Sequence, residues 1–496
     1  MVKIYNTLTG RKEPFKPLVR RKVRMYVCGI TVYDECHLGH ARSALVFDVI
    51  RRYLEFSGFS VIFVKNFTDV DDKIIKRAND LGIPWKEVTS RYIKAYYRDM
   101  KRLGIKRATK EPKATTHMAE IIKLVRTLTQ KGVAYQVNGD VYFQVEKFPA
   151  YGKLSKRKLG DMQAGARVEV DERKRHPMDF ALWKGAKPGE PAWKSPWGQG
   201  RPGWHIECSA MSMKHLGKTF DIHGGGMDLI FPHHENEIAQ SCAATGKAFA
   251  RYWLHNGFVQ INQEKMSKSL GNFFTIREIF EKSKWSEEIT GEVLRYFLLG
   301  THYRSPLDFS DQSLREAKNA LDGFYGLFQR LEEPSNQKKT GGESLQTEIE
   351  RLNKEFSLAM DDDFNTVAAL AAFQRLRGEA NKLFELDLSQ EMRVKVLHVF
   401  QDYGRVLGLF QVPAKGWKFQ VITGNLIIGE EGDTLKAHAT VESPGVSDGD
   451  IERFIAERNE ARKRRDFARA DEIRQTLAAQ GITLEDRPDG TTRWKR

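Results

Sequence analysis

The chain has 496 residues, of which 41% are hydrophobic and 29% are charged, and its formal net charge is +15. This composition excludes a largely disordered chain, which would be poor in apolar residues. No apolar run approaches the roughly 18–20 residues of a membrane-spanning helix, so we expect no membrane association.

The cysteines, the first residues and the excess of basic side chains bear on location and partners. Cys28, Cys36, Cys208 and Cys242 are too few for a disulfide framework and are expected to be free thiols or metal ligands. Residues 1–6 alternate like a short strand and lack the apolar stretch of a secretory signal, so we expect a cytoplasmic protein. The excess of Lys and Arg favours a polyanionic partner such as a nucleic acid, although it can also serve solubility alone.

The first clear unit spans residues 23–66. Residues 23–28 are typical of a short strand that ends at Gly29. Apolar residues then recur at spacings of three and four, which predicts a helix that stops at Gly58. Residues 59–66 are typical of a buried strand. This strand–helix–strand order predicts a parallel sheet, whose ligands bind at the carboxyl ends of the strands, where Cys28 and Thr68 are expected.

The middle of the chain has a different pattern. Residues 119–200 contain a hairpin pattern, a basic turn-rich stretch and a Trp/Pro/Gly-rich stretch, and are interpreted as an inserted subdomain. Strand patterns return at residues 220–223 and 258–261, with a helix between them that starts near Pro232. We expect these two strands to complete the parallel sheet.

The C-terminal third is predicted to be mainly helical. The pattern is helical from about residue 310 to 409. Residues 411–450 contain Pro, Gly and short alternating runs, which indicate a small β element after a domain boundary. Residues 451–480 are predicted to form one charged helical stretch.

Two motifs, far apart in the sequence, indicate phosphate chemistry. His37-Leu38-Gly39-His40 opens the first predicted helix, and Lys265-Met266-Ser267-Lys268-Ser269 follows the sheet. A helix N-terminus presents free N–H groups to an anion, and two imidazoles add donors. A lysine-rich loop supplies positive charge to a leaving pyrophosphate. Each motif alone has an ordinary surface interpretation, but together they favour nucleotide chemistry.

A second constellation contains ligands that metals accept. Cys28, Cys208, His233 and Glu237 are all residue types that bind zinc, and a helix places His233 and Glu237 on one face. There is no C-x-x-C pair, so two buried thiols beside a surface His–Glu pair remain the alternative interpretation. His234 follows His233 directly and is expected to point elsewhere.

With these motifs the chain resembles the cysteinyl-tRNA synthetases, a family of class I aminoacyl-tRNA synthetases. The two phosphate motifs are similar to the HIGH and KMSKS signatures of that class. The resemblance extends to the stretches at residues 26–34, 67–73, 203–209, 221–225 and 231–237, and is weakest between about 411 and 450. It implies an α/β fold in which a Rossmann-like parallel-sheet catalytic domain carries an inserted subdomain and is followed by a helical bundle and a small mixed C-terminal domain.

The resemblance also implies domain boundaries. The catalytic domain would comprise residues 1–118 and 201–260, interrupted by the inserted connective subdomain 119–200. Residues 261–315 would contact the stem and carry the KMSKS loop. A helical tRNA-binding bundle would span 316–410, and an anticodon-binding domain would span 411–496.

The family's functional residues are transferred by position. His37, His40, Lys265 and Lys268 would be catalytic, and with Gly39, Gly224 and Gly225 they would bind ATP and its Mg²⁺. One Zn²⁺ per chain would be held by Cys28, Cys208, His233 and Glu237, and would select the thiolate of cysteine over the hydroxyl of serine. The residues implied for the amino-acid pocket are Gly29, Thr31, Thr68, Trp204 and Asp228.

The reaction implied is activation of cysteine by ATP to cysteinyl-adenylate, followed by transfer to tRNA(Cys) by a monomeric enzyme. Two alternatives remain open on the sequence. One is a related adenylate-forming ligase that joins cysteine to a small amino-sugar, against which the extension beyond residue 411 argues. The other is a non-enzymatic RNA-binding protein with a structural zinc, against which both intact phosphate motifs argue.

Overall fold

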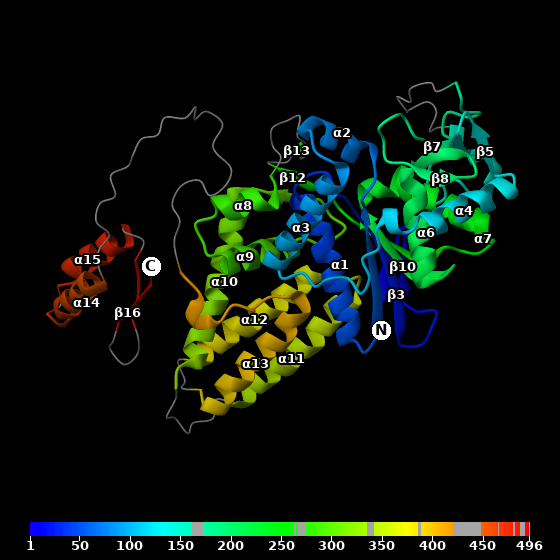
Figure 1. The fold of residues 1–496 in the computed structure, drawn as a ribbon. Coiled ribbons are helices and arrows are strands. Elements are labelled where there is room, and N and C mark those ends of the chain that lie inside the picture. The colour runs from blue at the N-terminus through cyan, green and yellow to red at the C-terminus, as the bar shows by residue number, and fades with distance from the viewer. Residues whose placement is uncertain are drawn as a thin grey trace.

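The computed structural model describes most of the chain, and Figure 1 shows its arrangement. The described residues are 1–160, 172–261, 264–265, 274–334, 342–384, 388–419, 448–464, 466–479, 482–486 and 492–495. Lys268 and most of the β element predicted at 411–450 lie outside them. Of Lys265 only the backbone is described.

A four-stranded parallel sheet in the order β11-β10-β3-β4 forms the centre of the molecule. Its strands are β3 (Lys22–Thr31), β4 (Ser60–Thr68), β10 (Phe220–Gly226) and β11 (Ala250–Asn256). Helix α1 (Leu38–Phe56) connects β3 to β4 and is buried along most of its length. The predicted strand–helix–strand unit and the α/β fold class are therefore confirmed. β3 continues past Gly29 to Thr31, three residues beyond the predicted end.

The prediction for the second half of the sheet was wrong in one strand. The strand at 258–261 is β12 (Val259–Ile261), and it pairs with β13 (Glu264–Lys265) and β14 (Leu307–Phe309) in a separate sheet. The fourth strand of the central sheet is β11, which sequence analysis missed. Six of its seven residues are buried, so it lacks the alternation that marks a half-buried strand.

The inserted subdomain is built on a five-stranded sheet in the order β5-β6-β7-β9-β8, in which all the described pairs are antiparallel. Its elements, with the helices next to it, are α4 (Met118–Gln130), β5 (Ala134–Val137), β6 (Asp140–Phe143), β7 (Phe180–Gly185), β8 (Trp193–Ser195), β9 (Gly198–Pro202), α6 (Trp204–Leu216) and α7 (Glu235–Thr245). The predicted hairpin is β5–β6. A buried hydrophobic cluster that includes Phe143 and Trp183 packs this part of the chain against one side of the central sheet, where it includes Tyr26 and Trp253.

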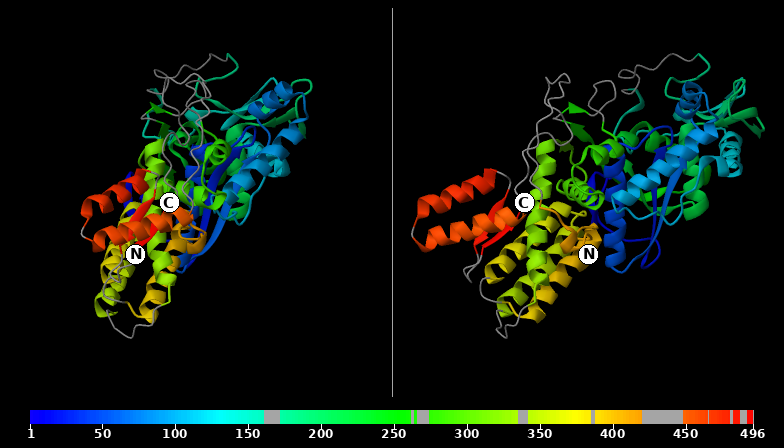
Figure 2. Two further views of the ribbon diagram at one scale, coloured as in Figure 1. Left: turned by 90° about the vertical axis from the view of Figure 1, so that its left-hand side faces the viewer. Right: turned by 60° about the vertical axis from the view of Figure 1, so that its left-hand side comes forward.

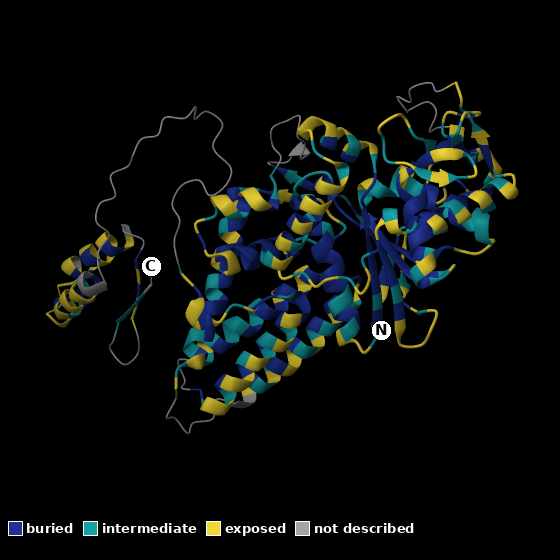
Figure 3. Ribbon diagram, in the orientation of Figure 1, coloured by how far each residue is buried: buried dark blue, intermediate teal, exposed yellow. Residues whose placement is uncertain are grey.

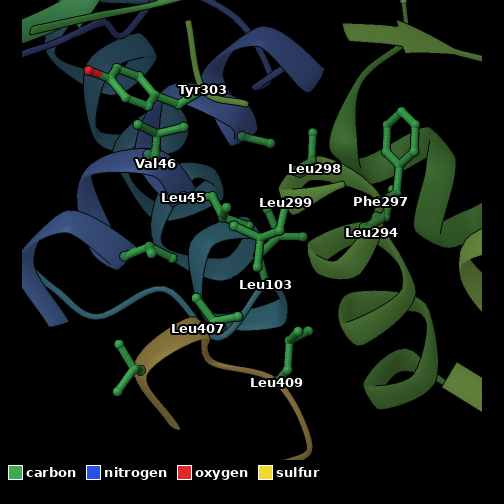
Figure 4. Packing of buried hydrophobic residues seen from close by; sticks show 14 of the residues in the cluster. Leu45, Val46, Leu103, Leu294, Phe297, Leu298, Leu299, Tyr303, Leu407 and Leu409 are labelled. Carbon is green, nitrogen blue, oxygen red and sulfur yellow. The ribbon is translucent and has the colours of Figure 1, made fainter. Parts of the chain in front are cut away.

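The helices that follow the central sheet are α8 (Ile276–Lys282), α9 (Glu287–Leu299), α10 (Asp311–Glu332), α11 (Gly342–Asp361), α12 (Thr366–Phe384) and α13 (Gln390–Leu407). In Figure 1, α8, α9 and α10 lie to the left of α1, with α11, α12 and α13 below them. Figure 4 shows Leu45 of α1 beside Leu299 of α9 and Leu103, with Leu407 below them. One continuous hydrophobic core therefore joins the sheet to the bundle.

A buried ion pair crosses the same junction. The Arg295 guanidinium of α9 donates to the Asp48 carboxylate of α1 at 2.6 Å, and both side chains are 1% exposed. Arg295 also donates to the carbonyl oxygens of Leu103 and Leu407. One side chain thus links α1 and α9 to Leu103, at the C-terminal end of α3 (Trp85–Arg102), and to Leu407, at the end of α13.

The last part of the chain has a small core of its own. It contains α14 (Asp448–Lys463), α15 (Phe467–Ala479), β15 (Thr483–Asp486) and β16 (Thr492–Lys495). The predicted single helical stretch is therefore two helices packed on a hairpin, around a cluster that includes Ile451, Ile473 and Leu477. Figure 2 shows this unit, in red, beside the helical bundle, and Figure 3 shows its exposed outer helix surface.

The remaining elements lie in the first hundred or so residues, around the central sheet. They are the hairpin β1 (Lys3–Asn6) and β2 (Arg11–Pro14), and the helices α2 (Asp72–Leu81) and α3 (Trp85–Arg102). Among the described residues, every helix is too short or too polar to traverse a lipid bilayer.

Candidate active site

Four side chains predicted as metal ligands lie together at one edge of the central sheet; we call Cys28, Cys208, His233 and Glu237 the ligand cluster. Cys28 is on β3, Cys208 on α6, His233 on the turn before α7, and Glu237 on α7. The two Sγ atoms are 3.6 Å apart, and the Cys28 Sγ is 3.3 Å from Glu237 Oε1. His233 Nε2 is 3.1 Å from the same oxygen. All four potential ligand atoms lie within 4.8 Å of one another.

His234 was expected to point away from the cluster because it directly follows His233. In the structure its ring instead points toward the cluster. Residues Ile230–His234 form an irregular turn before α7, in which the backbone of Phe231 is extended (φ −138°, ψ 131°), and the rings of His233 and His234 both lie at the cluster. His234 Nε2 lies 3.3 Å from the Cys28 Sγ and 3.9 Å from Glu237 Oε1. Cys28, His223, His234 and Glu237 therefore form a second possible set of metal ligands around the same carboxylate.

The ligand cluster contains buried acids whose charge is balanced by protons when no metal is bound. Burial alone would raise the pKa of Glu237, but His223 and His233 lower it to about 2, so the carboxylate is ionised. The hydrogen bond from Cys28 lowers the pKa of Cys208 to about 6, which favours its thiolate. Burial and the hydrogen bond to Cys208 raise the pKa of Cys28. Burial alone would lower the pKa of His233, but hydrogen bonds to Cys208 and Glu237 outweigh it and raise that pKa to about 10. A bound metal cation would replace the protons on Cys28 and His233.

Sequence analysis missed the ring network that surrounds the cluster. His223 Nε2 donates to Glu237 Oε2 at 3.0 Å, and the His223 ring stacks on Trp253 with centroids 4.5 Å apart. His205 and His233 are joined through their Nδ1 atoms at 3.0 Å. His234 Nδ1 is 2.8 Å from His255 Nε2. Such partners orient metal ligands, and burial lowers the pKa of His205, His234 and His255, which keeps these rings neutral.

The predicted pocket residues surround the cluster from two sides. The Trp204 ring lies 4.3 Å from the His233 ring and remains 38% exposed, so it forms an outer wall. Thr68 donates from Oγ1 to Glu207 Oε2 at 3.0 Å, and Glu207 is a buried carboxyl that sequence analysis missed. A cavity of about 600 Å³, lined in part by Trp204, His205 and Asp71, opens beside this wall.

Two predicted glycines are explained by close packing of backbone. A Cβ on Gly29 would lie 1.5 Å from the carbonyl oxygen of Asn66, so glycine lets β3 approach β4 at this point. Thr31, two residues on, is paired with Thr68. A Cβ on Gly224 would lie 2.3 Å from the Phe47 ring of α1. The space where a side chain at residue 224 would lie is therefore filled by the Phe47 ring of this chain.

The remaining members of that loop lie near His234. A Cβ on Gly225 would lie 2.9 Å from the His234 ring. Asp228 is exposed in the short helix Met227–Leu229, beside Gly226. Asp228 is thus at the edge of the site, and the structure does not bring it into the ligand cluster.

His37 and His40 are arranged at the N-terminus of α1. The Gly39 N–H donates to His37 Nδ1 at 3.1 Å, and the His37 N–H donates to His40 Nδ1 at 3.3 Å. Because both Nδ1 atoms accept, both rings carry their proton on Nε2. Burial, with the charges of His37 and Lys65, lowers the pKa of His40, which keeps it neutral. The two rings, tilted by 31° with centroids 3.8 Å apart, can therefore donate from Nε2 to phosphate oxygens.

The chain on both sides of the second motif is anchored beside the first. β13 (Glu264–Lys265) leads into that motif by pairing with β12. After the motif, the Leu38 N–H donates to the Phe274 carbonyl at 3.4 Å, and the Ile276 N–H donates to the Cys36 carbonyl at 2.8 Å. His37 also pairs with Thr275. The chain that follows the second motif is therefore held against the start of the first, from which it is separated by more than two hundred residues.

The donor set of the ligand cluster fits zinc. Two thiols, an imidazole and a carboxylate match the ligands that Zn²⁺ takes, and the Cys28 Sγ to Cys208 Sγ distance of 3.6 Å suits two sulfurs on one tetrahedral ion. Oxygen-loving Mg²⁺ and Ca²⁺ do not suit two sulfur ligands. The cluster therefore has the composition of a zinc centre.

Comparison with known families agrees with this site. A family model described as the catalytic domain of class I tRNA synthetases (C) matches residues 14–319. A DALR domain matches residues 355–411, and a cysteinyl-tRNA ligase anticodon binding domain matches residues 444–494. Together these matches cover most of the chain.

Individual relatives extend over its full length. Cysteine–tRNA ligases of Geobacter metallireducens and Geobacter sulfurreducens are each 54% identical to it, over 100% of this chain and 99% of theirs. Methionyl-tRNA synthetase of Mycobacterium tuberculosis, solved with methionyl-adenylate, has a TM-score of 0.59 at 17% identity and covers 78% of this chain and 90% of that one. Agrobacterium radiobacter K84 agnB2 LeuRS, solved with tRNA, has a TM-score of 0.55 at 12% identity and covers 81% and 87%. At these identities the solved structures establish the fold.

Proposed function

The chain belongs to the cysteine–tRNA ligases, a family of class I aminoacyl-tRNA synthetases, and we infer from this membership that it activates cysteine with ATP and joins it to tRNA. The observation that carries the inference at the level of atoms is the convergence of Cys28, Cys208, His233 and Glu237 beside the helix that His37 opens. A thiol-selective site and a phosphate-binding helix are the two components that activation of cysteine needs.

We propose that the ligand cluster holds one Zn²⁺, which when bound offers a soft ligand position to the sulfur of the substrate. Sulfur binds zinc as a thiolate far better than a serine hydroxyl does, so selection follows from ligand chemistry. A hydrophobic pocket alone separates such close analogues by only roughly 10- to 200-fold. Trp204 would cover the bound amino acid, and Gly29, Thr31, Thr68 and Asp228 are proposed to line its pocket.

We propose that the first step is attack of the cysteine carboxylate on the α-phosphate of Mg-ATP, which forms cysteinyl-adenylate and releases pyrophosphate. His37 and His40 would donate their Nε2–H groups to phosphate oxygens, and the backbone at Gly39 lets the phosphates approach the helix. Lys265 and Lys268 would neutralise the departing pyrophosphate. Little proton transfer is needed, because this chemistry depends mainly on position and charge.

The second step would transfer cysteine to the terminal ribose of tRNA. A hydroxyl of that ribose attacks the carbonyl carbon of the adenylate, and AMP leaves with the pair of electrons of the anhydride bond. We propose tRNA(Cys) as the specific partner, held by the helical bundle and the C-terminal unit, whose match to an anticodon-binding domain supports this role. We also propose that the enzyme acts as a monomer in the cytoplasm, which size-exclusion chromatography and cell fractionation test.

The direct test is attachment of labelled cysteine or serine to total tRNA in the presence of ATP. We expect charging with cysteine and none with serine above background. A protein that supports cysteine-dependent ATP–pyrophosphate exchange but charges no tRNA would contradict the transfer step. Equal use of serine would contradict the proposed role of zinc in selection.

A further inference from the structure

A second cavity lies away from the ligand cluster, on the α3 side of the central sheet. Its volume is about 450 Å³, and it is enclosed by α1, β4, α3 and the segment that follows α3. None of the residues assigned above to metal, ATP or cysteine lines it. Its lining residues are Ala44, Phe63, Lys65, Tyr96, Tyr97, Met100 and residues of the stretch 101–111.

Lys65 is the one basic side chain buried at the bottom of this cavity. It is 9% exposed, and within the described part of the chain its Nζ has no hydrogen bond and no ion pair. The Tyr96 ring, with its centroid 5.4 Å from Nζ, is its only close polarisable neighbour among those residues. Most of the side chain is buried while Nζ is not fully enclosed by protein, so the ammonium group is available to an anion in the cavity that Lys65 lines.

The other charged groups of the cavity do not supply that partner. Glu111 is the only acid in the lining, and it accepts from Arg107 and from the Tyr97 hydroxyl. Lys101 and Lys106 are exposed at the open end and add further positive charge. Burial, which exceeds the opposing effects of Cys36 and Glu111, lowers the pKa of Lys65 to about 8. The cavity is therefore apolar along its walls and positive at both ends.

We propose that this cavity is a second ligand site, which binds a small monocarboxylate with an apolar or aromatic body. The carboxylate would pair with Lys65 at the bottom, and the apolar body would pack on Phe63, Tyr96 and Met100. The volume is that of a typical small-molecule site, and one buried cation matches one acid group. A polyphosphate does not fit, because it would need several buried cations where the lining has one.

The site is placed where a ligand can affect the reaction centre. Lys65 and Asn66 are neighbours on β4 and face opposite sides of the sheet. Asn66 Oδ1 accepts from the Gly29 N–H at 2.9 Å and lies 3.7 Å from the Cys208 Sγ. A ligand that holds Lys65 would therefore restrain the strand residue next to the one that contacts Gly29 and Cys208.

The test measures binding of 4-phenylbutyrate to the full-length protein by titration calorimetry, with the uncharged 4-phenylbutyramide as the matched ligand. We expect the acid to bind about tenfold or more tightly than the amide, as a charge-assisted hydrogen bond predicts. Lys65→Met should abolish that preference, and Lys65→Arg, which keeps the charge, should retain most of it. Lys101→Met, at the exposed end, is the matched control and should change the affinity for the acid less than threefold.

Competition separates this site from the catalytic one. Saturating ATP and cysteine should leave 4-phenylbutyrate able to bind, with an affinity changed by less than about tenfold, because the two sites are separate but can be coupled through β4. Displacement by ATP or cysteine would mean that the acid binds in the active site, and would overturn the proposal. Absence of binding to the wild-type protein, or equal affinity for acid and amide, would overturn it as well, and neither result depends on the folding of a variant.

Discussion

The ligand cluster and the C-terminal unit of α14, α15, β15 and β16 differ in how much of the chain holds each of them in place. The cluster draws on a strand, two helices and an irregular turn, and its contacts join residues 180 or more positions apart in the sequence. The described part of the C-terminal unit has a core cluster of six buried apolar residues and holds its hairpin by the Arg458–Asp486 pair at 2.7 Å. Arg493 contacts the bundle by donating to Glu333 Oε1 at 3.4 Å and to Gln329 Oε1 at 3.0 Å.

This difference corresponds to two physical tasks. Selection of a thiol at a metal needs ligand atoms fixed within tenths of an ångström, which only a dense buried network provides. Recognition of an RNA surface needs charge and reach, which a small and separately folded unit provides. A change at the cluster is therefore expected to stop activation itself, whereas a change in the C-terminal unit should affect only the use of tRNA.

The largest effect is expected from Cys208→Ser. Replacing one thiolate with a hydroxyl weakens metal binding, because serine is a poor zinc ligand. We expect less than one zinc per chain by elemental analysis, and cysteine-dependent ATP–pyrophosphate exchange reduced by more than about 100-fold.

The matched control is Cys242→Ser, which removes a half-buried thiol on α7 outside the cluster. It should retain its metal and most of its exchange activity. Full metal content in the Cys208 variant would contradict the assignment of that ligand.

The second prediction concerns the junction between the two halves. Asp48→Asn leaves the buried Arg295 guanidinium without its counter-charge, and breaking such a pair costs about 3–5 kcal/mol. The melting temperature should fall by roughly 5–10 °C, as measured by differential scanning calorimetry.

Glu55→Gln provides the comparison at the surface. It removes the partner of Arg51 in an i,i+4 pair that is partly exposed, so the loss should stay near 0.5 kcal/mol. Equal losses in the two variants would show that the junction does not depend on its buried charge.

The third prediction is a dependence of stability on pH. Asp99 of α3 is fully buried and one of its carboxylate oxygens has no hydrogen-bond partner, so burial raises its pKa to about 6. Because the folded pKa exceeds the unfolded value of about 3.9, the folded state binds more protons between these values. Stability contributed by the protonated acid is complete below pH 4 and is lost as the pH rises through 6.

Asp99→Asn removes this titration. Relative to wild type, the variant should gain about 2–3 kcal/mol of unfolding free energy between pH 4 and pH 7, as followed by urea denaturation at each pH. Asp402→Asn, at an exposed position, should show no such change with pH. A constant difference between Asp99→Asn and wild type across this range would contradict the raised pKa.

The ligands of the site could be predicted from the sequence better than the contacts that surround them. The four ligand residues lie in motifs and are residue types that bind metals, so they could be proposed without coordinates. The neighbouring rings of His205, His223 and His255 could not be predicted. The positions of His223 and His255 depend on how β10 and β11 align, and His205 reaches the site from α6. β11 itself has almost no exposed residue to create an alternating pattern, and for that reason the next strand along the chain was placed in the sheet instead.

His234 shows the same limit at a single residue. Consecutive residues of a regular helix point about 100° apart, so His233 and His234 were expected to diverge. The turn before α7 departs from helical geometry at Phe231, and the Nε2 atoms of His233 and His234 lie 3.1 and 3.9 Å from Glu237 Oε1. Local backbone irregularity of this kind has no signature in the residue types alone.

The smallest effect is expected from deletion of residues 448–496, which tests the comparison from its other side. Because this unit has its own core and few contacts with the bundle, its removal should leave cysteine-dependent ATP–pyrophosphate exchange within about twofold of wild type. The kcat/KM for tRNA charging should fall by on the order of 10- to 100-fold, which corresponds to about 1.4–2.8 kcal/mol of lost binding. Lower salt should restore part of that loss if the remaining bundle still attracts the phosphate backbone. If exchange falls in parallel with charging, the two regions are coupled, and the separation of fixed chemistry from flexible recognition is wrong.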